Sequence, residues 1–159
     1  MKAYQIALNL AKELATNTDI AKIVSDLYQG KQLLVFQDTI GQRDYESENI
    51  DIFPCAVVAT DSARGGRGKE KTIGINIVIS ARLPEHIDVS KPISTSVNNL
   101  LSIPGYDALT ELCGQIIQSI EIAKLGACFE SYNIDYDLES QVPVQYATIQ
   151  LEFTELHSF

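Results

Sequence analysis

The sequence predicts an α+β fold, in which a mostly antiparallel β-sheet is packed on one face by α-helices and includes a long β-hairpin. Three observations lead to this prediction. Apolar residues recur at helical spacing near the N-terminus and again over residues 107–125. Residues 73–81 and 144–156 instead alternate apolar and polar side chains, as strands with one buried face do. A chain of 159 residues, 45% of them apolar, can bury one core, so we expect a single domain over residues 1–159.

The N-terminal part predicts two helices and a short strand. The apolar stripe of the first helix comprises Ala3, Ile6, Ala7, Leu10 and Leu14. Residues 16–19 are polar, so they interrupt this helix and offer capping side chains for a second one. The stripe of the second helix comprises Ile20, Ile23, Val24 and Leu27. Gly30 is expected to terminate it, residues 33–37 to form a strand, and the polar residues 39–51 to form a loop.

Two strands in the middle of the chain predict the hairpin. Residues 53–60 form the first, with Pro54 at its entry because proline cannot donate a ladder hydrogen bond. The second strand places Ile73, Ile75, Ile77, Ile79 and Ala81 on its dry face. Residues 61–71 between them are polar and glycine-rich, so we expect a long hairpin tip.

The C-terminal half predicts a connection, a helix and a second strand pair. Residues 84–106 contain three prolines and suggest an irregular connection with a short helical piece near residues 97–101. The strongest helix follows over residues 107–125, where Asp107 is expected to cap the start and Gly126 to end it.

The last two strands are expected over residues 128–138 and 144–156. A short turn between them favours an antiparallel pair. The inward-facing residues of the final strand are Ala147, Ile149, Leu151 and Phe153.

Charge and cysteine content limit the class of protein. The formal net charge of −9 gives a field that repels nucleic acid and anionic membranes. Cys55, Cys113 and Cys128 are far apart and lack CxxC spacing, which argues against a disulfide framework or a zinc site. Cys55 and Cys113 fall on apolar patterns and are expected in the core. The N-terminus has no unbroken apolar run, so we expect neither a signal peptide nor a membrane span, and a cytoplasmic origin.

A compact basic segment, ARGGRGKEKT at residues 63–72, contrasts with this acidic chain. It holds four of the twelve Lys and Arg residues, namely Arg64, Arg67, Lys69 and Lys71. A phosphate-binding loop is not expected, because Ala63 replaces the first glycine, Glu70 replaces the Ser or Thr, and a strand rather than a helix follows. Three interpretations remain: a solvated tip, contact with nucleic-acid phosphates, or docking onto an acidic neighbouring copy.

The sequence offers no catalytic, cofactor-binding or metal-binding set of residues, and the prediction is that the protein is not an enzyme. His86 stands beside Glu85 in a loop and His157 lies near the C-terminus, without the spacing of a metal motif. An acidic run comprises Asp135, Asp137 and Glu139. A solvated strand face explains this run better than calcium, because the order of an EF-hand loop is missing. A small binding module, or an enzyme with a site around His86, is the alternative.

The order of the elements resembles that of the tail terminator (tail completion) proteins of long-tailed bacteriophages. The resemblance runs over the N-terminal helix, the segment IDIFPCAVVAT, the hairpin into TIGINIVIS, the helix ALTELCGQIIQSI and the strand QYATIQLEFTEL. It covers nearly the whole chain and rests on hydrophobic pattern and element order rather than on signature residues. Neck and head–tail joining proteins share a similar α/β layout.

The resemblance implies a non-catalytic virion protein of the tail or neck, assembled in the bacterial host cytoplasm. It implies a ring, commonly of six subunits, that caps the tail tube, stops its polymerisation and provides the interface for head–tail joining. The expected partners are the tail tube protein, sheath and head connector proteins, and DNA contacted non-specifically in the lumen, with no membrane and no cofactor. The basic segment would then lie at a ring interface or face the lumen. The alternative is a neck connector of the same particle.

Overall fold

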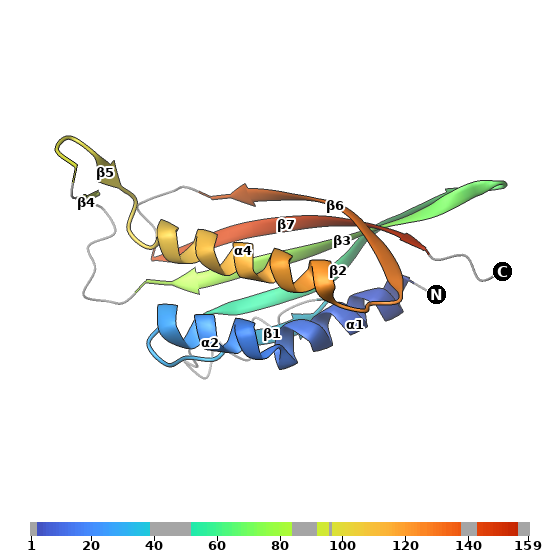
Figure 1. Cartoon of the computed structure of the whole chain (residues 1–159), viewed down its shortest axis with the longest axis horizontal. Helices are drawn as coiled ribbons and strands as arrows, with labels where there is room; N and C mark the ends of the chain where they lie inside the picture. The colour runs from blue at the N-terminus through green and yellow to red at the C-terminus, as the bar shows by residue number, and fades with distance from the viewer. Residues whose placement is uncertain (1–2, 39–51, 84–91, 96, 138–142, 156–159) are drawn as a thin grey trace.

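The computed structural model describes residues 3–38, 52–83, 92–95, 97–137 and 143–155. Its elements, in chain order, are α1 (Ala3–Thr16), α2 (Thr18–Leu27), β1 (Leu34–Gln37), β2 (Cys55–Gly66), β3 (Lys69–Arg82), β4 (Ile93–Ser94), β5 (Leu101–Ser102), α4 (Tyr106–Ile122), β6 (Ala127–Tyr136) and β7 (Val144–Glu155). Five strands form one sheet in the order β1-β2-β3-β7-β6, and the helices pack on one face of it (Figure 1). The predicted α+β class is confirmed.

The sheet is mixed rather than purely antiparallel. β2, β3, β7 and β6 pair antiparallel with their neighbours, whereas β1 pairs parallel with β2. A parallel pair cannot be joined by a tight turn, which is consistent with the long connection between residues 38 and 54. The central strands are therefore the ones that the alternating patterns predicted, and the parallel strand lies at an edge.

The core lies between β3, β7 and the helices. The inward residues of these two strands are at most 3% exposed: Ile73, Ile75, Ile77, Ile79, Ala147, Ile149, Leu151 and Phe153. They meet in register, so that Ile73 is opposite Phe153 and Ile77 is opposite Ile149. The predicted period-two patterns of both strands are confirmed, because each alternate residue enters the same dry layer.

Capping explains where α1 and α2 separate. The Asn17 side chain accepts hydrogen bonds from the backbone N–H groups of Asp19 and Ile20 at 2.9 and 3.0 Å. These bonds satisfy amides that a helix start leaves without partners. At the other end, Gln29 and Gly30 both have positive φ, and the N–H of Gly30 donates to the carbonyl of Ser25. The predicted cap and terminator of the second helix are therefore confirmed.

The start and end of α4 differ from the prediction. The N-cap is Gly105, which has a φ of 77° and no side chain with which to cap, so the expectation that Asp107 caps this helix is wrong. Asp107 instead lies in the first turn, where its charge favours the helix dipole. The helix ends at Ile122, before the predicted Gly126.

Two connections also differ from the prediction. No helical piece forms near residues 97–101, because the Thr95 hydroxyl accepts from the Val97 N–H and Asn99 takes a left-handed φ of 67°. This local turn places β4 antiparallel to β5. A long polar tip was also expected between the two strands of the central hairpin, and this expectation is wrong. β2 and β3 continue through the segment and leave only Arg67 and Gly68 as the turn.

Candidate functional site: two arms at opposite ends of the molecule

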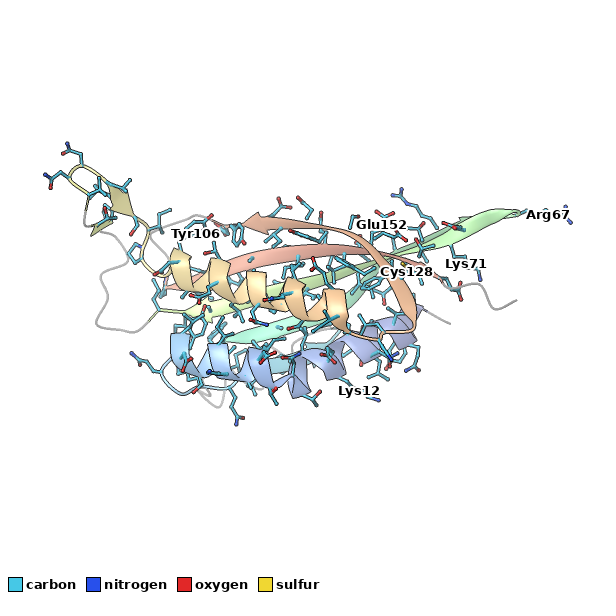
Figure 2. The ribbon with its side chains drawn as sticks, in the orientation of Figure 1. Lys12, Arg67, Lys71, Tyr106, Cys128 and Glu152 are labelled. Atoms are coloured by element: carbon cyan, nitrogen blue, oxygen red, sulfur yellow. The ribbon has the colours of Figure 1, made fainter. Side chains whose placement is uncertain are left out.

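The basic segment projects from the body as a pair of strands, here called the basic arm (residues 63–72). β3 pairs with β7 only as far as Thr72, opposite Thr154, so no third strand supports the arm on that side among the described residues. Three of its cationic side chains, those of Arg64, Arg67 and Lys71, are exposed, with Arg67 at the far tip and Lys71 nearer the body (Figure 2). The arm thus carries charge away from the core on a two-stranded ribbon.

The structure brings most of the predicted basic residues together on this arm. Arg64, Arg67 and Lys71 are exposed, while the side chain of Lys69 lies outside the described part of the chain. Lys71 Nζ lies 3.6 Å from Glu155 Oε2 at the end of β7. The Lys71 side chain is 69% exposed, so water screens this ion pair and it contributes little to the stability of the arm.

A hollow of about 640 Å³ lies at the base of the basic arm. Its lining residues are Ala3, Ala63, Arg64, Gly65, Gly66, Lys71, Thr72, Ile73 and Glu155. The lining combines small or apolar residues, among them Ala63 and Ile73, with the charged groups of Arg64, Lys71 and Glu155.

A second arm, formed by β4, β5 and the turn residues 97–100, lies at the other end of the long axis (Figure 1). We call it the apolar arm because Val97, Leu100 and Leu101 are 58%, 52% and 57% exposed. None of the three packs against the core cluster. The pairing of β4 with β5 consists of two residue pairs, which is marginal for a hairpin alone in water.

The apolar arm joins the body through a tightly packed joint before α4. Gln145 is buried, and its Nε2 donates to the Pro104 carbonyl at 2.6 Å. A Cβ at Gly105 would collide with the Leu83 side chain and lie 2.8 Å from Gln145 Oε1. Glycine is therefore required there for its left-handed φ and for space.

A second, polar hollow of about 400 Å³ lies on the face of the sheet opposite the helices. Asn76, Gln150 and Asn133 stand side by side in it on β3, β7 and β6. Asn133 Nδ2 donates to Gln150 Oε1 at 3.3 Å, whereas the buried Asn76 Oδ1 has no hydrogen-bond partner among the described residues. This surface can hydrogen-bond with polar groups. Within the described ranges, no group of three His, Cys, Asp or Glu residues is placed to hold a metal ion.

The cysteines are free thiols, two of them in the core as predicted. Cys55 and Cys113 are buried, and burial raises the pKa of both, that of Cys113 to about 12. Neither is therefore a thiolate near neutral pH. Cys128 is exposed at the start of β6, and the Glu130 side chain raises the pKa of its thiol.

Several residues named from the sequence lie outside the described residues, namely Glu85, His86, Glu139 and His157. The predicted site around His86 and the loop over residues 39–51 stay predictions for the same reason. Asp135 is exposed on β6, as expected for a solvated strand face. Sequence reasoning missed the apolar arm, although the Asn98–Asn99 pair in it is a turn signal.

No family model matches the sequence, and no curated protein is significantly similar to it. None of the helices in the described part of the chain is long and apolar enough to cross a membrane. The resemblance to phage tail terminators therefore stays a prediction.

Proposed function

We propose that this protein is a non-catalytic virion assembly protein, a ring-forming tail terminator. It caps the phage tail tube, stops polymerisation of the tube and provides the interface for head–tail joining. The observation that carries this proposal is the pair of chemically different arms at opposite ends of one elongated body (Figure 1). Two different patches that meet between copies make a heterologous contact, and such contacts close into rings when the rotation permits.

The order of helices and strands gives the second support, because it is the order on which the resemblance to tail terminators rests. In this proposal the ring contains six copies and binds the tail tube protein on one face. Sheath and head connector proteins bind the other face, and Arg67 lies at a ring interface or faces DNA in the lumen. The protein is made in the bacterial cytoplasm and stays in the virion.

The first test is the native mass of the purified protein, followed by negative-stain imaging. Six copies of the 17.5 kDa chain give about 105 kDa. Tail tubes polymerised with the protein should have a fixed length, whereas tubes without it should keep growing. A protein that stays monomeric both alone and with tubes, and leaves tube length unchanged, contradicts the proposal. Rings that bind the head connector but do not affect tubes indicate a neck connector instead.

A matched variant tests the basic arm within this function. Replacing Arg64, Arg67, Lys69 and Lys71 with Ser removes four charges while leaving the glycines of the arm in place. We expect weaker ring formation or weaker attachment to the tube, with a salt dependence that is reduced relative to the wild type. If the ring and its capping of tubes survive unchanged, the basic arm is only a solvated tip.

A further inference from the structure

We propose that the apolar arm of one copy inserts into the hollow at the base of the basic arm of the next copy. This inference rests on the proposed ring and names the contact that would build it. The occupant of the hollow is thus a second copy of this chain, and the inserted groups are Val97, Leu100 and Leu101.

The apolar arm needs a partner for a physical reason. Its three large apolar side chains are each more than half exposed and lie within five residues of one another in sequence. Large apolar groups gathered on a projecting element mark an interaction surface more often than a solvated one. The hairpin that carries them has only two residue pairs, which stabilise its conformation weakly. Contact with another surface would also stabilise that conformation.

The hollow has the size and lining to receive such groups. Its volume of about 640 Å³ falls within the range of pockets that hold ligands of moderate size. Ala63 and Ile73 provide apolar surface, and the Lys71 side chain lies against Gly65, so that its stem adds to the lining.

The net charges around the two patches have opposite signs. Arg64, Lys71 and Glu155 line the hollow, so two cations there face one carboxylate. At the other end of the molecule α4 begins beside the apolar arm, with Asp107 and Glu111 exposed in its first turns, and the helix contains no Lys or Arg. Insertion of the arm would bring these carboxylates toward the cations of the next copy, which favours this orientation over others.

The position of the patches makes the contact one between copies. Tyr106, where α4 starts, lies on the side of the molecule from which the apolar arm projects, whereas Arg67 lies at the opposite end, at the tip of the basic arm (Figure 2). One copy therefore offers an arm at one end and a hollow at the other, and each contact leaves a free patch for the next copy. This head-to-tail arrangement either closes into a ring or continues as a filament.

Two variants with complementary defects test the contact. The arm variant carries Val97→Ser, Leu100→Ser and Leu101→Ser, and the hollow variant carries Ala63→Gln and Gly66→Gln. Ile122→Ser is the control, because Ile122 is 78% exposed and belongs to neither patch. Far-UV circular dichroism and thermal unfolding first establish that each variant is folded.

We expect each variant alone to be monomeric and the control to form the same ring as the wild type. An equimolar mixture of the two variants should form a heterodimer of about 35 kDa, twice the 17.5 kDa chain mass, and nothing larger. The reason is that the hollow variant supplies an intact arm and the arm variant supplies an intact hollow, so each pair can make one contact and no further one. Native mass spectrometry distinguishes the two chains by mass.

A cross-link gives an independent measurement. In a Cys128→Ser background, Leu100→Cys combined with Ala63→Cys should form disulfides between copies under mild oxidation, because inserted residues come within disulfide range. Moving the second cysteine from Ala63 to Thr110, on α4, should abolish the cross-link.

The outcomes separate this inference from the proposed function. Wild-type rings that cap tubes, together with an arm variant that still forms rings, overturn the inference and leave the proposed function standing. A mixture that stays monomeric while both variants are folded also overturns it. A wild-type protein that never self-associates, even on tubes, overturns both.

Discussion

The two arms have the same secondary structure, yet the body of the protein supports them in different ways. The basic arm continues two strands of the core, and its root is the row where Ile73 meets Phe153. The apolar arm has no such row. It depends on the joint at Gly105 and Gln145 and on two residue pairs of its own.

The difference teaches that order in a projecting hairpin can come from the core or from contact with a partner. The basic arm is polar and rich in glycine, so water solvates it well. Its direction is set by β2 and β3, because it is a continuation of these two strands. The apolar arm exposes side chains that water does not solvate well, so its surface is suited to burial elsewhere. Substitutions at the two roots should therefore have different consequences.

The largest expected effect is at the root of the basic arm. Phe153→Ala should lower the free energy of unfolding by about 3–5 kcal/mol, because Phe153 is fully buried and its ring packs 5.7 Å from that of Phe129. Urea unfolding at one protein concentration measures this change. Ile122→Ala is the matched exposed control and should change stability by less than about 0.5 kcal/mol. A loss below about 1 kcal/mol for Phe153→Ala would mean that the core row does not hold the arm.

The core that supports the basic arm was predictable from the sequence. Isoleucine at every second position from Ile73 to Ile79 indicates a strand with one buried face, and the alternation from Ala147 to Phe153 indicates the same. The Asn17 cap was also predictable, because the polar residues 16–19 separate the apolar stripes of two helices. Local pattern and local chemistry both pointed to the same structure in these regions.

The apolar arm and its joint were not predictable in the same way. The apolar residues from Val97 to Leu101 alternate over too few positions to distinguish a strand from a short helix. A turn forms instead because the Thr95 hydroxyl bonds to the backbone, and this side-chain contact is not visible in the sequence pattern. The requirement for glycine at 105 comes from Leu83 and Gln145, which are distant in sequence. The hollow likewise depends on residues that four separate elements, α1, β2, β3 and β7, bring together.

The second prediction tests the joint of the apolar arm. Gly105→Ala should destabilise the protein by about 2–4 kcal/mol, because alanine is strained at a φ of 77° and its Cβ would collide with Leu83. Gly30→Ala is the matched control, since Gly30 has a φ of 78° and a Cβ there would meet nothing within 4 Å. We expect the control to cost only about 1–2 kcal/mol. Chemical denaturation of both variants isolates the packing contribution, and equal losses would show that the joint is not tightly packed.

A smaller effect of opposite sign is expected on α4, between the two arms. Gly114 is exposed in the interior of this helix, and an added Cβ would meet nothing within 4 Å. Gly114→Ala should therefore raise the free energy of unfolding by about 0.5–1 kcal/mol, because alanine loses less backbone entropy in a helix. Thermal unfolding measures the gain. Ring formation should be unchanged, because Gly114 belongs to neither patch, and a ring lost in this variant would point to an interface on α4 instead.

The smallest effect concerns the electrostatics at the root of the basic arm, around Cys128 near the start of β6. A hydrogen bond and charge repulsion from Glu130 raise the pKa of the Cys128 thiol, and Glu70 on the arm adds to this. A raised pKa means that less reactive thiolate is present at any given pH below it, so labelling by a disulfide reagent should be slow at pH 7–8 and increase as the pH rises. Glu130→Gln should lower the pKa and speed labelling.

Cys55 and Cys113 are the internal controls for this measurement, because both are buried and should react only after unfolding. Arg64→Gln is the matched control for the arm. If the arm cations controlled the thiol, its pKa would lie below its usual range, and Arg64→Gln would slow labelling by removing a favourable charge. We expect that variant to leave the rate nearly unchanged while Glu130→Gln raises it. If Arg64→Gln instead slowed labelling and Glu130→Gln left it unchanged, the cations of the basic arm would be stabilising the Cys128 thiolate on the sheet. Their charge would then be directed at the same copy, which contradicts the proposed contact between copies.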